Sequence, residues 1–194
     1  MIVAKTSQSK VNDNRNVITM KVTLRGMRPP VWRRLAIPGT MTLRDLHQAI
    51  QAVIGWEDCH LHLFEIRGKD YGDRYSVDDV YDENSVTLNS VLKSSKRFTY
   101  VYDFGDHWEH TIIIEKNEPA AADLSYPVCI TGKRQCPPED CGGVWRYQNL
   151  LAAVADPDHP ERKELLEWLD EDFDPAHIDL ENTNSMLAYY FRRE

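Results

Sequence analysis

Apolar and polar residues alternate near the start of the chain in the manner of half-buried β-strands. In residues 17–24 the even-numbered positions are Ile, Met, Val and Leu, whereas the odd-numbered positions are mostly polar. A second run, VWRRLAIP at 31–38, follows after the connection RGMRPP, whose paired prolines sit where no ladder N–H is needed. The two runs predict a β-hairpin with one buried face.

A helical pattern follows in residues 43–54. Its apolar side chains recur at the spacing of one helix face, at Leu43, Leu46, Ile50, Val53 and Ile54. Thr42 and Asp45 have the spacing of a capping box at the helix start. Gly55 follows the last apolar position, where a left-handed residue commonly ends a helix.

The rest of the chain reads as more strands and then helices. Strands are predicted over 60–66, 96–104 and 107–115, helices over 143–157 and 160–172, and a closing helix within 182–194. We therefore expect an α+β fold: a mostly antiparallel sheet, an early packed helix in a ββα start, and a helical C-terminal third. The expected organisation is a flexible N-terminal arm over 1–16 and one domain over 17–194.

Composition limits the cellular setting. None of the 194 residues belongs to an apolar stretch long enough to span a membrane, and the polar start lacks the apolar segment of a secretory signal. A cytoplasmic location without membrane partners is therefore expected. Four cysteines in such a chain are thiols or metal ligands more often than disulfides.

The net charge of −8 is unevenly distributed. The first fifty residues carry nine Lys or Arg against two acids, so the remainder is strongly acidic. Four arginines of this basic segment are candidates for nucleic-acid binding: Arg25, Arg28, Arg33 and Arg34. An acidic whole argues against indiscriminate binding to phosphates, and the alternative is that the basic hairpin pairs with acidic groups of the same chain.

The stretch YDFGDHWEH at 102–110 concentrates ionisable side chains around a turn. Gly105-Asp106 between two alternating runs predicts a two-residue type II′ turn. With that register, Asp103, Trp108 and His110 share one face, and Asp103 lies diagonal to His110. The Asp103–His110 pair is either an acid/base dyad of a catalytic site or a satisfied buried pair.

Histidines and cysteines offer possible metal ligands. His60 and His62 are two apart on a predicted strand and so share a face, to which the hairpin could add His107, His110 or Asp103. Cys129, Cys136 and Cys141 flank a Pro/Gly-rich loop, but only the last spacing fits a zinc knuckle. A zinc site is thus one reading, and a braced loop with free thiols is the other.

Together VWRRLAIP, TLRDLHQAIQAVIGW, HLHLFEI, YDFGDHWEH and PVCITGKRQCPPEDCGGVWRY resemble the plasmid pRiA4b ORF-3-like family. Its members are described as passenger proteins of insertion elements, some under the resolvase-like name TnpR. The resemblance implies a single α+β domain and a prokaryotic or mobile-element context, and it implies no catalytic residues. A serine recombinase needs a nucleophilic serine among phosphate-gripping arginines, and no such cluster surrounds Ser7 or Ser9.

Three functions compete at this point. The first is a non-enzymatic binding or accessory module that acts with a protein partner or mobile-element machinery. The second is a metal-dependent enzyme, a hydrolase or nuclease, that uses the His/Asp cluster around YDFGDHWEH. The third is nucleic-acid binding through the basic N-terminal hairpin. The first has most support, because the chain carries no P-loop, Rossmann, G-x-S-x-G or H-E-x-x-H motif.

Overall fold

A computed structural model describes residues 16–121, 124–169 and 173–192. Eight strands form one sheet in the order β5-β4-β3-β6-β7-β1-β2-β8, and each neighbouring pair is antiparallel except β4 and β5. The strands are β1 (Asn16–Leu24), β2 (Trp32–Pro38), β3 (His62–Ile66), β4 (Lys69–Gly72), β5 (Tyr81–Asp82), β6 (Arg97–Tyr102), β7 (Trp108–Pro119) and β8 (Val128–Lys133). The predicted α+β class with a mostly antiparallel sheet is confirmed.

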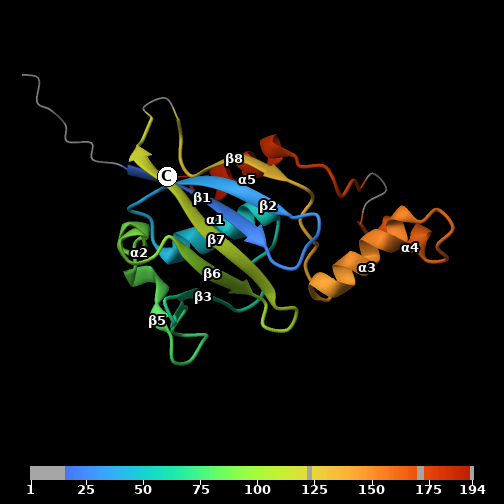
Figure 1. The fold of residues 1–194 in the computed structure, drawn as a ribbon, viewed down its shortest axis with the longest axis horizontal. Helices are drawn as coiled ribbons and strands as arrows, with labels where there is room; N and C mark the ends of the chain where they lie inside the picture. Colours follow the sequence, from blue (N-terminus) through green and yellow to red (C-terminus); the bar gives the residue numbers. More distant parts are fainter. Residues whose placement is uncertain (1–15, 122–123, 170–172, 193–194) are drawn as a thin grey trace, which may run out of the picture.

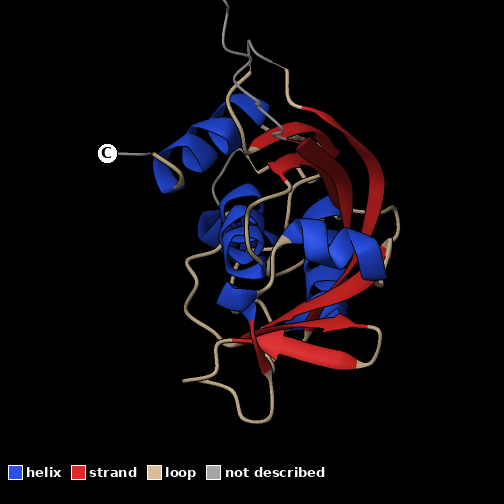
Figure 2. Cartoon of the chain, turned by 90° about the vertical axis from the view of Figure 1, so that its left-hand side faces the viewer, coloured by secondary structure: helices blue, strands red, loops and turns tan. Residues whose placement is uncertain are grey.

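Helices accompany this sheet (Figure 1). They are α1 (Leu43–Ile54), the 3-10 turn η1 (Glu83–Ser85), α2 (Leu88–Ser94), α3 (Gly143–Ala155), α4 (Arg162–Leu169) and α5 (Leu180–Tyr190). The strands curve around α1, which lies on their concave side (Figure 2). Helices α3 and α4 lie together at one end of the molecule, beyond the sheet (Figure 1). No helix among the described residues has the length and apolar character needed to cross a bilayer.

Helix α1 forms where the apolar pattern predicts it. The Asp45 backbone N–H donates to Thr42 Oγ1, and the Thr42 N–H donates to Asp45 Oδ2, which completes the capping box. Gly55 ends the helix with φ 92°, a left-handed conformation that glycine adopts without a Cβ clash. The buried face of α1 and the inward-facing residues of the first hairpin, such as Met20 and Leu35, belong to one hydrophobic core.

The turn of the second hairpin differs from the prediction. Tyr102 pairs with Trp108, so the connection has five residues rather than two, and positive φ falls on Asp103 and His107 instead of Gly105. This one-residue shift moves Trp108 and His110 to the other face of the sheet. The observed register is favoured because it buries Tyr102, Trp108 and His110 together, each at most 2% exposed.

Several smaller elements were not predicted. β8 lies within the Pro/Gly-rich loop expected around the cysteines, and β4, β5 and α2 lie between residues 66 and 96, where no element was predicted. Asn184 of α5 bonds both the N–H and the carbonyl of Cys129, so a helix side chain covers part of the β8 edge. The expected flexible arm lies outside the described residues, apart from Asn16, which begins β1.

Candidate functional site

A polar cleft of about 250 Å³ opens beside α1. It lies where α1, the segment that follows it, the start of β3 and the turn after β4 meet. Its walls are formed by Arg44, Asp58, Cys59, His60, Leu61, His62, Asp73, Ser76 and Val77. The described structure thus gathers ionisable groups from four separate stretches of sequence at one surface opening.

His47, fully buried in α1, belongs to a closed ring of hydrogen bonds. Gln51 Nε2 donates to the Tyr100 hydroxyl, which lies 2.8 Å from His47 Nδ1, and His47 Nε2 lies 2.6 Å from Asp58 Oδ1. The Asp58 N–H donates to Gln51 Oε1 and closes the ring. Because Tyr100 accepts from Gln51, its own proton goes to Nδ1, and we assign the His47 proton to Nε2.

His62 stacks on His47 and has a carboxylate of its own. The two imidazole rings are nearly parallel, with centroids 3.5 Å apart. His62 Nε2 lies 2.7 Å from Oε2 of Glu83, a residue of η1 that is fully buried. Arg44 spans both carboxylates, with Nη2 at 3.1 Å from Asp58 Oδ2 and Nη1 at 3.7 Å from Glu83 Oε1. Two His–carboxylate pairs therefore lie side by side under one arginine.

Burial sets the protonation of these groups. It lowers the pKa of His47 from 6.5 to about 4, so this imidazole is neutral at neutral pH. Burial also acts to raise the pKa of Asp58, but its bond to His47 and the nearby Arg44 outweigh this, and the net pKa is lowered. The N–H of Tyr75 and the hydroxyl of Ser76 lower the pKa of Asp73. The cleft thus holds ionised carboxylates beside a neutral imidazole.

The two sequence motifs meet at a second place, which we call the motif joint. It consists of the hairpin turn at 102–107 and the loop at 139–143. The Tyr102 hydroxyl donates to Glu139, and the Gly142 N–H donates to Asp106 Oδ2 at 2.8 Å. A Cβ on Gly143 would lie 2.7 Å from the Asp106 carbonyl oxygen, so the paired glycines allow two backbones to touch.

The structure separates Asp103 from His110. Asp103 Oδ1 accepts from the Gly105 N–H and lies 4.0 Å from His60 Nδ1, whereas His110 Nδ1 contacts the Trp108 carbonyl at 3.1 Å. No hydrogen bond or ion pair joins Asp103 to His110 in the part of the chain that the structure describes. The register shift is the reason, because it places His110 in the core under Trp56, where burial lowers its pKa to about 4.

The other histidine candidates divide between the cleft and the motif joint. His62 belongs to the cleft, His60 reaches the motif joint at 3.0 Å from Asp140 Oδ1, and His107 is exposed on the turn. Two groups of three potential ligands occur among the described residues: His47, Asp58 and His62, and His60, Asp103 and Asp140.

The cysteine candidates do not join either group. Cys129, Cys136 and Cys141 are all buried. Burial raises the pKa of Cys129 to about 11 and that of Cys141 to about 12, so these thiols stay protonated at neutral pH. No group of three potential metal ligands within the described ranges contains a cysteine.

Most of the arginine candidates have partners inside the chain. Arg25 pairs with Glu109, and Arg34 forms two bonds to Glu115, at 2.6 and 3.0 Å. Arg33 is buried and donates to the carbonyls of Val53 and Arg134. Arg28 is exposed in the β1–β2 connection. The first hairpin therefore uses most of its predicted basic patch to hold the fold.

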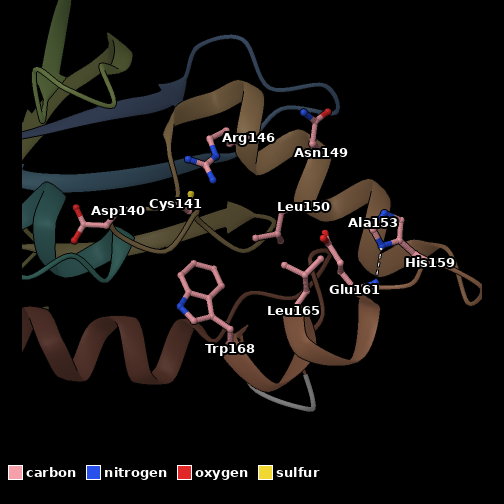
Figure 3. A pocket seen from close by; sticks show the side chains of 10 residues that line it. All are labelled: Asp140, Cys141, Arg146, Asn149, Leu150, Ala153, His159, Glu161, Leu165 and Trp168. Carbon is pink, nitrogen blue, oxygen red and sulfur yellow. Dashed lines mark hydrogen bonds between the residues drawn. The ribbon is translucent and has the colours of Figure 1, made fainter.

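A further hollow of about 350 Å³ lies between α3 and α4. Leu150, Leu165 and Trp168 face one another across it, and Arg146 and His159 lie at opposite ends (Figure 3). The hydrogen bond drawn in Figure 3 joins residues close in sequence, from the Glu161 N–H to His159 Nδ1 at 3.3 Å. This arrangement gathers less ionisable chemistry than the cleft.

Sequence reasoning missed three cleft residues: His47, Asp58 and Glu83. A signal for His47 existed, because it lies one helical turn after Leu43 and thus within the predicted apolar face of α1. Asp58 and Glu83 lie in a loop and in a 3-10 turn, and nothing in their local pattern marks them. Only the fold brings them to His47 and His62.

Comparisons with known proteins find relatives along most of the chain. A sequence profile of plasmid pRiA4b ORF-3-like proteins matches residues 16–182. The uncharacterized protein y4hQ of Sinorhizobium fredii is 40% identical over 177 residues, which cover 89% of this chain and 91% of that protein. The crystal structure of MM3350, a protein of unknown function from Methanosarcina mazei Go1, aligns with a TM-score of 0.80 at 38% identity and covers 87% of this chain and 97% of that one.

Proposed function

Since this chain belongs to the plasmid pRiA4b ORF-3-like family, we propose that it is a non-enzymatic binding module that holds a small cationic ligand in the cleft beside α1. The accessory role in plasmids or mobile elements rests on the family's name. In that role a protein partner or mobile-element machinery would respond to the bound state.

One observation carries the proposal: carboxylates outnumber permanent positive charges at the cleft. Asp58 and Asp73 line it, Glu83 lies buried behind it, and Arg44 is the arginine that faces them. The pKa values of Asp58 and Asp73 are lowered, and His47 is neutral. A cleft with this excess of negative charge attracts cations and repels phosphates.

A binding role fits better than acid/base catalysis because the polar groups already have partners. Both ring nitrogens of His47 take part in the closed ring of hydrogen bonds. A general base needs a nitrogen or oxygen free to take a proton from a substrate. The ring instead fixes the side chains in place, which is the pre-organisation that ligand binding requires.

Amide chemical shifts measured by NMR test the proposal. Zn²⁺, a linear polyamine and inorganic phosphate are titrated separately into the full chain. We expect a cation to shift the amides of Cys59, Leu61 and Ser76, and phosphate to leave them unchanged. Asp58→Asn should weaken the response, whereas Asp158→Asn, a change at an exposed site outside the cleft, should not. A cleft that responds to phosphate alone, or to no probe, contradicts the proposal.

A metal-dependent hydrolase or nuclease is the second candidate. The observation in its favour is that His47, Asp58 and His62 each offer a ligand atom within 4.8 Å of the others. Hydrolysis of a phosphodiester dye or of plasmid DNA, measured with added Mn²⁺ or Zn²⁺, tests it. Turnover that disappears in His62→Ala supports this candidate, and metal binding without turnover favours the binding module.

Nucleic-acid binding through the basic hairpin keeps the least support. Arg25, Arg33 and Arg34 have partners within the chain, so binding a phosphate requires them to give up internal bonds. The prediction is tested by the affinity for duplex DNA at low and high salt, since phosphate contacts weaken steeply with salt.

A further inference from the structure

Four elements converge on the stacked histidines at the cleft. Helix α1 supplies His47, the segment after it supplies Asp58, β3 supplies His62 and η1 supplies Glu83. Each imidazole has a carboxylate oxygen within 2.7 Å, and the two rings are in contact at 3.5 Å. Two imidazoles and two carboxylates offer the nitrogen and oxygen atoms that zinc and similar transition-metal ions bind.

We propose that this group binds one divalent transition-metal ion of the zinc type through His47, Asp58 and His62. The inference rests on the proposed function, because it names the cation that the same cleft would hold. Glu83 would act from behind His62 as the residue that orients it.

The separation of the ligand atoms is close to what a metal requires. One atom each of His47, Asp58 and His62 lie within 4.8 Å of one another. Bonds of roughly 2.0–2.2 Å in a tetrahedral site place ligand atoms about 3.3 Å apart. His47 Nε2 and Asp58 Oδ1, which are 2.6 Å apart, would have to separate, and the two stacked rings would have to turn toward a common point, because an imidazole binds a metal in its ring plane. Asp58 is exposed at the rim, so its side chain can make its part of this adjustment.

The outer contacts match the way metal-ligating histidines are usually held. Such a histidine presents one ring nitrogen to the metal and bonds the other to a carboxylate or hydroxyl. Here Glu83 contacts Nε2 of His62, which leaves Nδ1 for the ion, and Tyr100 contacts Nδ1 of His47, which leaves Nε2. The ligand atom of His47 is thus the one that faces Asp58.

Glu83 presents a carboxylate oxygen without a hydrogen bond beside the proposed ligands. The residue is fully buried, its Oε2 contacts His62, and its Oε1 has no hydrogen-bond partner among the described residues. Arg44 Nη1, at 3.7 Å, is too far for a hydrogen bond. A buried carboxylate oxygen without a partner is costly, and a positive ion nearby on His62 would reduce that cost.

The ring of hydrogen bonds sets a limit on affinity. Without metal, the His47 proton lies on Nε2 and is bonded to Asp58. Metal binding at Nε2 requires this proton to move to Nδ1, and the Tyr100 proton then loses His47 as its acceptor. The ion therefore competes with an existing network, and we expect micromolar rather than nanomolar affinity.

Calorimetric titration of Zn²⁺ into the untagged full chain tests the inference, with Co²⁺ absorption as a second probe of ligand type. We expect one saturable equivalent in the wild type. Asp58→Asn and His62→Ala should each weaken it by about 100-fold or more, because losing a ligand costs at least as much as losing one of its outer partners, which costs roughly 10–100-fold. His177→Ala removes an exposed histidine outside the cleft and should leave the affinity unchanged.

The design separates folding from ligation. Buried His62 supports the fold, so His62→Ala is interpreted only if its thermal unfolding stays cooperative; Asp58→Asn keeps the shape of a half-exposed side chain and decides the question otherwise. Zn²⁺ uptake that Asp58→Asn does not weaken, or no saturable uptake, overturns the inference. If a polyamine shifts the cleft amides while Zn²⁺ does not, the metal inference fails and the proposed function stands; if neither does, both fail.

Discussion

The cleft and the motif joint hold similar residue types and differ in how those residues are used. At the motif joint, Tyr102 donates to Glu139 and Asp106 accepts from a backbone N–H, so these groups connect two loops. At the cleft, ionised carboxylates surround a neutral buried histidine, and Glu83 keeps an oxygen without a hydrogen bond. The density of polar residues in a motif therefore marks a structural connection here, and an excess of carboxylates around a neutral histidine marks the candidate site.

The first prediction, with the largest effect, concerns the close backbone approach at the motif joint. Gly143→Ala should reduce the free energy of unfolding by about 3 kcal/mol or more, because it combines positive φ with a Cβ 2.7 Å from the Asp106 carbonyl. Gly68→Ala is the matched control: φ is +71° there, but open space surrounds the new Cβ, and the cost should be about 1 kcal/mol. Equal losses in chemical denaturation would show that the two loops are not in contact.

The second prediction concerns two buried histidines, His47 beside the cleft and His110 in the core. The pKa of His47 and that of His110 both fall from 6.5 to about 4 because of burial, so the unfolded chain binds protons in this interval that the folded chain does not. Stability is therefore complete above about pH 6.5 and decreases as the pH falls toward 4. From about pH 7 to about pH 5, each histidine should remove about 2 kcal/mol.

Urea denaturation across this pH range measures the slope. His110→Gln should flatten it, whereas His177→Gln, at an exposed position, should not. An unchanged slope in His110→Gln would contradict the burial of that imidazole in the folded state.

The third prediction concerns the hydroxyl at the centre of the motif joint. Tyr102→Phe removes an acceptor for the N–H groups of Cys59 and His60 and the donor to Glu139. We expect a loss of about 2 kcal/mol, since buried polar groups lose their partners. Tyr189→Phe, at a residue 68% exposed, should change the free energy of unfolding by less than about 0.5 kcal/mol. Similar thermal shifts in both variants would place Tyr102 outside the joint.

The fourth prediction has the smallest effect on stability and sharpens the contrast most. Asp58→Asn should change the free energy of unfolding by less than about 1 kcal/mol, because the side chain is partly exposed and an ion pair in contact with water, such as the one with Arg44, contributes little stability. The same variant should weaken cation binding strongly. A loss of stability as large as that of Gly143→Ala would assign the cleft a structural role instead.

The sequence predicted those features that depend on residues within a single helix or strand. Helix α1 and its caps follow from the spacing of Leu43, Leu46 and Ile50 and from Thr42, Asp45 and Gly55, because these signals act within one turn of helix. The hairpin register could not be obtained in the same way. A five-residue turn with positive φ at Asp103 and His107 is selected by burial of Trp108 and His110 against Trp56, a residue about 50 positions earlier in the chain.

Of the candidate site, the sequence predicted only His60 and His62. His47 was hidden as a polar residue within an apolar helical face, and Asp58 and Glu83 come from irregular segments that meet it through sheet packing. Contacts between residues 47, 58, 62 and 83 depend on tertiary structure, which a pattern within one element does not encode. Searching predicted buried faces for polar residues would have found His47.

Anomalous scattering at the zinc edge, from crystals of the full chain soaked in Zn²⁺, tests the central claim most directly. The account predicts a peak bounded by His47 Nε2, Asp58 and His62, and none at the motif joint between His60, Asp103 and Asp140. A peak at the motif joint with an empty cleft, or peaks on exposed histidines alone, would contradict the assignment of the cleft as the binding site.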